Sequence, residues 1–275
     1  MTDSPVLEVR DLTVRYRRPG LGARTAPRPA LQGVSLDVQA GESVALVGES
    51  GSGKSTLARA VLRLVPPTSG EVRLMGEDWL GLPPRELRRR RQWVQMVFQD
   101  PFGSLNPRLT AGEALAEPLR ALRPELDPAT RANRVSAALE RVGLTAADAQ
   151  RYPRSFSGGQ CQRIGIARAM ICEPRLLICD EPVSSLDVSI QAQIVNLLLD
   201  LQRQAGTALL FISHHLALVR LIATRVHVLY QGRIVESGTT REVLDSPRHP
   251  YTQSLIAAVP QLADSGGANP LSSPS

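Results

Sequence analysis

Apolar residues along the first hundred positions either alternate with polar ones or form short runs, and both patterns are typical of β-strands. Residues 7–9 and 12–16 alternate with a period of two and predict two short antiparallel strands. Arginine, proline and glycine dominate residues 17–29, which predicts a loop. Further strands are predicted at residues 31–38, 43–47, 71–75 and 93–98, and a helix at residues 55–64.

The pattern changes at about residue 101, after which apolar residues follow a helical spacing. Helices are predicted at residues 112–122 and 129–142, and no strand is expected before residue 176. Strands that alternate with helices then imply a mostly parallel sheet covered on both faces. These later strands are predicted at residues 176–179, 208–212 and 226–229, with helices at residues 190–204 and 216–222.

Together the elements predict an α/β fold with a mostly parallel sheet, antiparallel strands at the N-terminus and an inserted helical subdomain. We expect one large domain over residues 5–260, since this length can bury a single core. Its core would comprise residues 5–100 and 172–260, and its helical subdomain residues 101–171. The last residues, 261–275, are rich in glycine, serine and proline and are expected to be disordered.

Composition favours a soluble protein. The 275-residue chain is 43% hydrophobic, yet it has no stretch near the ~20 apolar residues of a membrane span and no apolar leader among its first residues. We therefore expect a cytoplasmic location, with any membrane role depending on a spanning partner. Cys161, Cys172 and Cys179 form no C-x-x-C pair, which favours reduced, packed thiols over disulfides.

The charge of the chain is positive but dispersed. The net charge is +6, with 26 acidic residues mixed among 32 basic ones, so the charge alone does not favour a nucleic-acid partner. Residues 88–91 form the densest basic run, which turns through all sides of a helix at about 100° per residue. A solvated segment is the favoured interpretation, and contact with anionic lipid is the alternative.

Lys54 is the only lysine in the chain and lies in the sequence GESGSGKST at residues 48–56. The spacing G-x-x-x-x-G-K-S follows the predicted strand 43–47 and precedes a predicted helix, as in a P-loop. Glycines let successive N–H groups face a polyphosphate, while Lys54 would reach the β- and γ-phosphates and Ser55 would ligate Mg²⁺. The alternative is a glycine-rich turn without a ligand. The predicted phosphate-binding residues are Gly48, Glu49, Ser50, Gly51, Ser52, Gly53, Lys54, Ser55 and Thr56.

Asp180 and Glu181 follow directly on the apolar run 176–179. A buried strand of an open α/β sheet delivers such carboxylates to the C-terminal edge of the sheet. Because neighbouring side chains of a strand point to opposite faces, the two acids are predicted to have different roles. Asp180 would hold Mg²⁺, and Glu181 would polarise the attacking water. The alternative is a chance acidic pair at the end of a strand.

The residues Ser157, Gly158, Gly159 and Gln160 precede a segment that is compatible with a helix. A turn of small residues at a helix N-terminus can bind an anion, although most such turns only cap the helix. Its position between the P-loop and the paired acids favours an anion site.

The order of these motifs resembles that of the ATP-binding subunits of ABC transporters, over about residues 6–260. Beside the P-loop, six features carry the resemblance: FSGGQ at 156–160 is similar to the signature, LLICDEP at 176–182 to the Walker B strand, SLD at 185–187 (which ends in Asp187) to the D-loop, Gln99 to the Q-loop glutamine, His214 to the switch histidine, and Tyr16 to the aromatic residue of the A-loop.

The resemblance implies an ATPase that binds ATP and Mg²⁺. Two subunits would close head to tail, so that Ser157, Gly158 and Gly159 cap a γ-phosphate held by the partner's P-loop. Glu181 would act as general base, His214 would contact the γ-phosphate, and Gln99 would link Mg²⁺ and water to the helical subdomain. Tyr16 would stack on adenine, and a partly buried core position is its alternative.

Residues 99–108 and 249–260 are similar to the oligopeptide, dipeptide and nickel importer subfamily. This implies a peripheral ATPase on the cytoplasmic face of the cell membrane that energises peptide import. Its partners would be two integral membrane permeases, a second ATPase subunit of the same or a homologous chain and, indirectly, an extracytoplasmic substrate-binding protein. No nucleic acid is expected as a partner.

Three alternatives stay open. The same machine could import nickel, glutathione or an antibiotic peptide. A soluble ABC ATPase could act on DNA or ribosomes, although the long insertions usual in such relatives are not visible in the sequence. The third alternative is an assembly or regulatory subunit. The intact Asp180, Glu181 and Lys54 argue against it.

Two positions depart from the family pattern. Cys161 follows the signature glutamine where a basic residue is usual, which would remove a charge near the partner's nucleotide and weaken ATP binding or dimer closure. His215 follows the switch histidine where an acid is common, which predicts pH sensitivity near the γ-phosphate.

Overall fold

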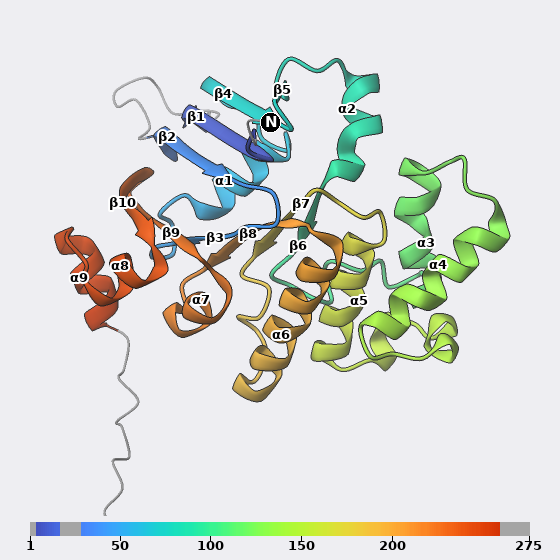
Figure 1. The fold of residues 1–275 in the computed structure, drawn as a ribbon. Helices are drawn as coiled ribbons and strands as arrows, with labels where there is room; N and C mark the ends of the chain where they lie inside the picture. Colours follow the sequence, from blue (N-terminus) through green and yellow to red (C-terminus); the bar gives the residue numbers. More distant parts are fainter. Residues whose placement is uncertain (1–3, 17–28, 259–275) are drawn as a thin grey trace, which may run out of the picture.

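Two β-sheets, with helices between and around them, form the structure (Figure 1). The computed structural model describes residues 4–16 and 29–258. The predicted loop, apart from Pro29, and the predicted disordered tail lie outside the described residues.

The smaller sheet is antiparallel, with the strand order β2-β1-β4-β5. Its strands are β1 (Leu7–Val14), β2 (Leu31–Val38), β4 (Ser69–Leu74) and β5 (Glu77–Asp78). The prediction of two strands within residues 7–16 was wrong, because β1 runs through as one strand. Asp11 adopts a φ of 47°, and the pairing with β2 shifts register between Val9 and Leu12. This irregularity bends the strand without turning the chain back, so both halves keep the same two partners.

The larger sheet has the order β10-β9-β3-β8-β7-β6. All its neighbouring pairs are parallel except that of β10 with β9, which confirms the predicted mostly parallel α/β sheet. Its strands are β3 (Ser43–Val47), β6 (Val94–Val97), β7 (Leu176–Asp180), β8 (Ala208–Ser213), β9 (Arg225–Tyr230) and β10 (Arg233–Thr239). The edge strand β10 escaped prediction because its side chains are only partly buried and form no apolar run.

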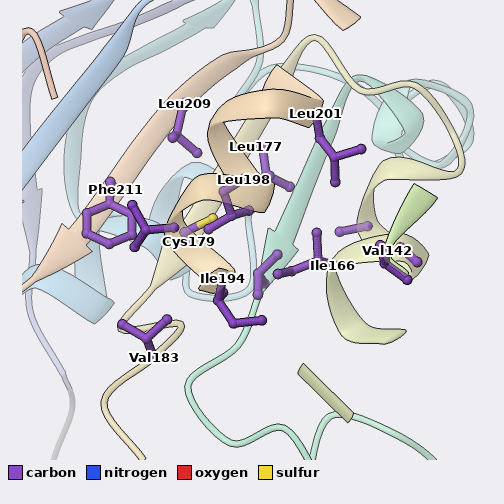
Figure 2. Packing of buried hydrophobic residues seen from close by; sticks show 14 of the residues in the cluster. Val142, Ile166, Leu177, Cys179, Val183, Ile194, Leu198, Leu201, Leu209 and Phe211 are labelled. Atoms are coloured by element: carbon purple, nitrogen blue, oxygen red, sulfur yellow. The ribbon is translucent and has the colours of Figure 1, made fainter. Parts of the chain in front are cut away.

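Both faces of the larger sheet are covered, and its strands divide their side chains between two cores. In β3, Val44 and Leu46 pack with α1 (Lys54–Val61) and the smaller sheet, while Ala45 and Val47 join the opposite core. Figure 2 shows this second core, in which β7 and β8 face side chains of α6 (Val188–Ala205). Burial on both faces explains why these strands appear in the sequence as continuous apolar runs.

The chain between β6 and β7 is helical. It contains α3 (Ala111–Leu122), α4 (Pro128–Arg141), two 3₁₀ turns (Ala146–Gln150 and Pro153–Ser155) and α5 (Gly158–Met170). The helix α5 packs on α3, α4 and α6, so it joins this segment to the sheet. The observed helices agree with the predicted ones at 112–122 and 129–142, while the boundaries 101–171 of the subdomain stay a prediction.

The remaining helices are short. They are α2 (Pro84–Arg90), the 3₁₀ turn Arg91–Trp93, α7 (Leu216–Ile222), α8 (Thr240–Asp245) and α9 (Pro250–Ala257). Of these, α7 and α8 add buried residues to the core around the larger sheet. In the basic run, Arg88 and Arg89 are exposed, whereas Arg90 pairs with Glu77 and lies over the ring of Trp93. Over the described ranges, 4–16 and 29–258, no helix combines the length and apolar character needed to cross a bilayer.

Candidate active site

The glycine loop between β3 and α1 packs closely against neighbouring backbone. Gly48 has a φ of 152° and Gly53 one of 114°, both in the region that favours glycine. A Cβ atom at Gly48 would lie 2.2 Å from the carbonyl oxygen of Leu229, and one at Gly53 would lie 2.5 Å from that of Ala30. The loop therefore requires glycine at both ends for steric reasons, and turns with glycine in such conformations can form an anion cradle.

Lys54 begins α1 and is almost wholly buried. Its Nζ atom donates hydrogen bonds to the carbonyl oxygens of Gly48 (2.7 Å) and Glu49 (2.9 Å) and lies 4.0 Å from Oε1 of Glu181. Burial lowers the pKa of Lys54, although the neighbouring carboxylates oppose this effect. The buried hydroxyl of Ser52 has no hydrogen-bond partner within the described part of the chain. A buried ammonium and an unpaired hydroxyl in one loop fit a phosphate ligand.

Asp180 ends β7 and lies beside the first turn of α1. Its Oδ1 atom accepts a hydrogen bond of 3.0 Å from the hydroxyl of Ser55. Burial raises the pKa of Asp180, while the bond from Ser55 lowers it. A carboxylate and a hydroxyl are hard oxygen donors, and Mg²⁺ in nucleotide sites takes one or two such protein ligands besides phosphate and water. The pair therefore fits a magnesium ion.

Glu181 departs from strand geometry, so the predicted alternation of side chains does not apply to it. Its φ is 48°, and its N–H donates to the carbonyl oxygen of Ile212 at 2.9 Å. A left-handed backbone at a non-glycine residue is uncommon and costs energy, so the surrounding structure must hold it. This conformation aims the carboxylate towards the ends of the neighbouring strands.

The three predicted catalytic residues come together at this edge of the sheet. Gln99 follows β6, Glu181 follows β7 and His214 follows β8. The Nε2 atom of Gln99 donates to Oε2 of Glu181 at 3.3 Å, and Nδ1 of His214 lies 3.2 Å from Oε1 of Glu181. Because β6, β7 and β8 are adjacent and parallel, residues that follow them meet at one edge.

Tyr16 lies beyond the end of β1 and is 45% exposed. Its hydroxyl lies 3.2 Å from that of Thr56 in the P-loop. The alternative of a core position is therefore wrong, because the strand that would bury Tyr16 ends at Val14. An exposed aromatic ring tethered to the phosphate cradle is placed to stack on a base.

The predicted signature residues form a second group at the N-terminal ends of α5 and α6. The hydroxyl of Ser157 accepts a hydrogen bond from the Gln160 N–H, and the side chain of Gln160 accepts one from the Ser157 N–H. A Cβ atom at Gly158 would lie 3.4 Å from Leu186, and one at Gly159 would lie 2.9 Å from Ile190. Asp187 caps α6 next to them but makes no side-chain capping bond. The glycines therefore let the two helix ends approach closely.

The predicted effect of Cys161 on a partner's nucleotide is not supported by its position. Cys161 is fully buried, and its thiol donates to the carbonyl oxygen of Pro153 at 3.4 Å. Burial raises the pKa of this thiol to about 11, so it is neutral at pH 7. Successive residues of a helix point in directions about 100° apart, so Cys161 faces the core although it follows the signature residues directly. All three cysteines are free and buried, as predicted.

His215 lies at the surface, and its N–H donates to the hydroxyl of Ser213. Its predicted influence on pH sensitivity stays a prediction.

One residue at the P-loop was not predicted. The hydroxyl of Tyr251, from α9, accepts a hydrogen bond of 2.9 Å from the N–H of Glu49. Its ring stacks on that of Tyr230, with the ring centroids 4.0 Å apart. The only sequence signal was the resemblance of residues 249–260 to an importer subfamily, which assigns no role to Tyr251.

Comparison with protein families gives two matches. The model described as ABC transporter matches residues 31–184, from the start of β2 to just past the paired acids. The chain belongs to the ABC transporter family. This ABC protein therefore has an ATP-binding cassette that hydrolyses ATP. The model described as the C-terminal region of oligopeptide/dipeptide transporters matches residues 235–272.

Curated relatives agree with this membership. The ABC protein is 56% identical over 231 residues to the oligopeptide transport ATP-binding protein OppF of Salmonella typhimurium, covering 84% of this chain and 69% of the relative. It is 50% identical over 260 residues to a putative peptide import ATP-binding protein of Brucella ovis, covering 94% of this chain and 80% of the relative.

Solved structures share the fold. A dimer of the ATP-binding cassette MJ0796 with ADP and phosphate is 31% identical, with a TM-score of 0.75 over 86% of this chain and 99% of that one. The protein cbiO1 from Clostridium perfringens, part of the transporter complex cbiONQ, is 26% identical with a TM-score of 0.76 over 88% of this chain and 91% of that one. These neighbours confirm the predicted P-loop α/β fold.

Proposed function

We propose that this ABC protein is the ATPase subunit of a peptide importer. The carrying observation is its 56% identity to an oligopeptide transport ATP-binding protein, together with the match of its C-terminal region to a family of oligopeptide and dipeptide transporters. Family membership alone supplies the ATPase, and these two likenesses support the substrate class.

In the proposed site, the loop of residues 48–56 holds the phosphates of ATP with its backbone N–H groups. The ammonium of Lys54, which donates to the carbonyl oxygens of Gly48 and Glu49, also contacts the β- and γ-phosphates. This contact is favourable because a buried ammonium gains a nearby negative charge. Tyr16 stacks on the adenine, and its bond to Thr56 holds the ring beside the cradle.

Ser55, Asp180 and Gln99 would hold Mg²⁺, whose charge, when bound, offsets the negative charge that develops on the phosphates. The direct bond between Ser55 and Asp180 keeps both oxygen donors at the carboxyl end of β7. Gln99 reaches the same place from the end of β6.

Glu181 is proposed as the general base for hydrolysis. Its carboxylate lies between Gln99 and His214, at hydrogen-bond distance from both. In this position it can accept a proton from a water that attacks the γ-phosphate. Gln99 orients the carboxylate, and His214, which is 54% exposed, is placed to contact the γ-phosphate.

The signature group acts on a second ATPase subunit in the proposed assembly. Ser157, Gly158, Gly159 and Gln160 present a helix N-terminus, and Asp187 lies beside it. Helix N-termini favour phosphate, so this surface suits the γ-phosphate held by a partner's P-loop. Two permease subunits would bind this ATPase pair at the cytoplasmic face of the membrane, and a substrate-binding protein would deliver peptide from outside.

The proposal is tested by identifying what the chain assembles with. The full-length tagged chain is captured from native membranes in mild detergent, and co-purifying proteins are identified by mass spectrometry. We expect two integral permeases and a second ATPase subunit. A comparison variant, Phe102→Asp, places a charge on an exposed apolar residue within the segment 99–108 that resembles importer subunits.

A second step identifies the substrate class. The captured complex is reconstituted in vesicles with its binding protein, and ATP hydrolysis is measured with oligopeptides, Ni²⁺ or glutathione. Stimulation by oligopeptides alone supports the proposal. Stimulation by Ni²⁺ or glutathione alone contradicts peptide import, and capture of ribosomal or DNA-repair proteins without permeases contradicts the importer altogether.

A further inference from the structure

The helix α9 reaches the P-loop from far along the chain. Glu49, the second residue of that loop, donates its N–H to the hydroxyl of Tyr251 at 2.9 Å, across 202 positions of sequence. No other hydroxyl group of the described residues donates to or accepts from Glu49. The contact therefore depends on where α9 is held.

Several bonds hold α9 in place. Oε1 of Glu236, on β10, accepts from the N–H of Arg248, and its Oε2 accepts from that of His249. The Nδ1 atom of His249 then accepts from the N–H of Tyr251 and caps the helix. Tyr251 also stacks on Tyr230 at the end of β9. The position of the hydroxyl is thus set by the sheet edge on one side and by the helix cap on the other.

The same peptide segment is held from its other side by Lys54. The N–H of Glu49 bonds to Tyr251, and its carbonyl oxygen accepts from Nζ of Lys54 at 2.9 Å. Glu49 therefore lies between the hydroxyl of α9 and the ammonium that contacts phosphate. Burial raises the pKa of Tyr251, so the hydroxyl stays neutral and can accept this bond at pH 7.

We propose that Tyr251 is a positioning residue for ATP binding, which fixes the P-loop at Glu49 and couples the order of α9 to the nucleotide site. It acts through Glu49 and does not contact the nucleotide. This role rests on the proposed phosphate site at Lys54. It also gives a function to the C-terminal region, because α9 lies within the segment that matches the oligopeptide/dipeptide transporter family.

The coupling must act in both directions. If a fixed α9 favours the conformation of the loop that binds ATP, bound nucleotide must favour the fixed α9 by the same factor. Loss of one neutral hydrogen bond that positions the loop should change affinity by about 3- to 10-fold. Bound nucleotide should therefore stabilise the ordered state of α9 by the same factor.

Tyr251→Phe tests the role in the full-length chain, because it keeps the ring stack on Tyr230 and removes only the hydroxyl. Binding of the slowly hydrolysed analogue AMP-PNP with Mg²⁺ is measured by calorimetry. We expect the dissociation constant to rise about 3- to 10-fold, with kcat for ATP within about two-fold of the wild type. Ser254→Ala, which removes an exposed hydroxyl bonded within α9, is the matched control and should leave both values unchanged.

Hydrogen exchange of residues 250–257 gives a second measurement that a purely structural role would not move. AMP-PNP should slow exchange of these amides at least about 3-fold in the wild type and in Ser254→Ala, but not in Tyr251→Phe. Tyr230→Leu removes the stack and keeps the hydroxyl, and it should show an intermediate loss of affinity.

These measurements distinguish a wrong role for Tyr251 from a wrong phosphate site. Wild-type affinity and wild-type protection in Tyr251→Phe would overturn the positioning role while leaving the nucleotide site intact. Equal binding by the wild type and Lys54→Ala would overturn the phosphate site itself, and the role of Tyr251 with it.

Discussion

At the residue scale, the chemistry depends on the environment of a few charged groups. Lys54 is buried, and the nearby carboxylates of Asp180 and Glu181 favour its charged form. Glu181 reaches Lys54, Gln99 and His214 only because its backbone adopts a left-handed conformation after β7. A substitution of Glu181 that keeps this backbone conformation and changes only the end of the side chain should therefore impair hydrolysis and leave ATP binding intact.

Glu181→Gln makes this change, since an amide has nearly the same shape and cannot accept a proton from water at neutral pH. We expect ATP hydrolysis to slow at least ~100-fold while ATP still binds. Steady-state hydrolysis and ATP-dependent self-association or association with a second ATPase subunit are measured. Lys54→Ala is the comparison variant and should lose ATP binding. Near-normal turnover in Glu181→Gln would remove Glu181 from the role of base.

At the element scale, helix caps serve both stability and function. Both α3 and α5 begin with a capping box, formed by Thr110 with Glu113 and by Ser157 with Gln160. The capping box of α3 belongs to none of the predicted ATP-binding motifs. The capping box of α5 is part of the predicted signature. The same local structure thus has one function at α3 and, by our proposal, two at α5.

Thr110→Ala and Ser157→Ala distinguish the two functions. Each removes the side chain that caps a helix, so each should lower the free energy of unfolding by about 1 kcal/mol. Only Ser157→Ala should in addition reduce ATP hydrolysis in the assembled complex, because its hydroxyl would also contact the partner's phosphate. Urea denaturation and ATPase rates measure the two effects. Equal ATPase rates in the two variants would leave Ser157 with a capping role only.

At the scale of the whole molecule, β9 connects the two sheets through charges. Arg225 donates to Glu42 at 2.5 Å and to Asp37 of β2 at 2.9 Å. The bond from Arg225 lowers the pKa of Asp37. Burial raises the pKa of Glu42, but the bonds from Arg225 and the Gln39 N–H and the charge of Arg225 together lower it below its ordinary value. Two positions further along β9, burial and the charge of Arg225 lower the pKa of His227 to about 4. At the junction of the sheets, Asp37, Glu42 and His227 are therefore all harder to protonate in the folded chain than in the unfolded chain.

The stability of the protein should fall as the pH is lowered. Between the ordinary histidine pKa of 6.5 and the value of about 4, the unfolded chain binds a proton at His227 and the folded chain does not. This difference should cost on the order of 2–3 kcal/mol of unfolding free energy by pH 4. The depressed pKa values of Asp37 and Glu42 add a further loss at lower pH.

Urea denaturation at a series of pH values measures this loss, with His227→Gln as the test variant. In this variant the free energy of unfolding should depend much less on pH between 6.5 and 4. Its stability at pH 7 should also be lower, because the bond from position 227 to Ser237 is lost. Substitution of the exposed His215 by Gln is the matched control and should keep the slope. An unchanged slope in His227→Gln would contradict this origin of the acid sensitivity.

The sequence alone determined the class of fold, the order of most elements and the family. Buried parallel strands need continuous apolar runs and P-loops need glycine and lysine at fixed spacing, so both leave local signals that survive without coordinates. The strands β3, β7 and β8 and the helices α3, α4 and α6 were predicted in this way. The paired acids and the glycine loop were found for the same reason.

The tertiary structure decided what depends on contacts between distant segments. The single strand β1, the edge strand β10 and the backbone of Glu181 follow from register and packing, which no local pattern encodes. The burial of Cys161 and the bond from Glu49 to Tyr251 likewise depend on where α5 and α9 pack. A local pattern reports which face a side chain prefers, whereas the partner on that face is set by the fold.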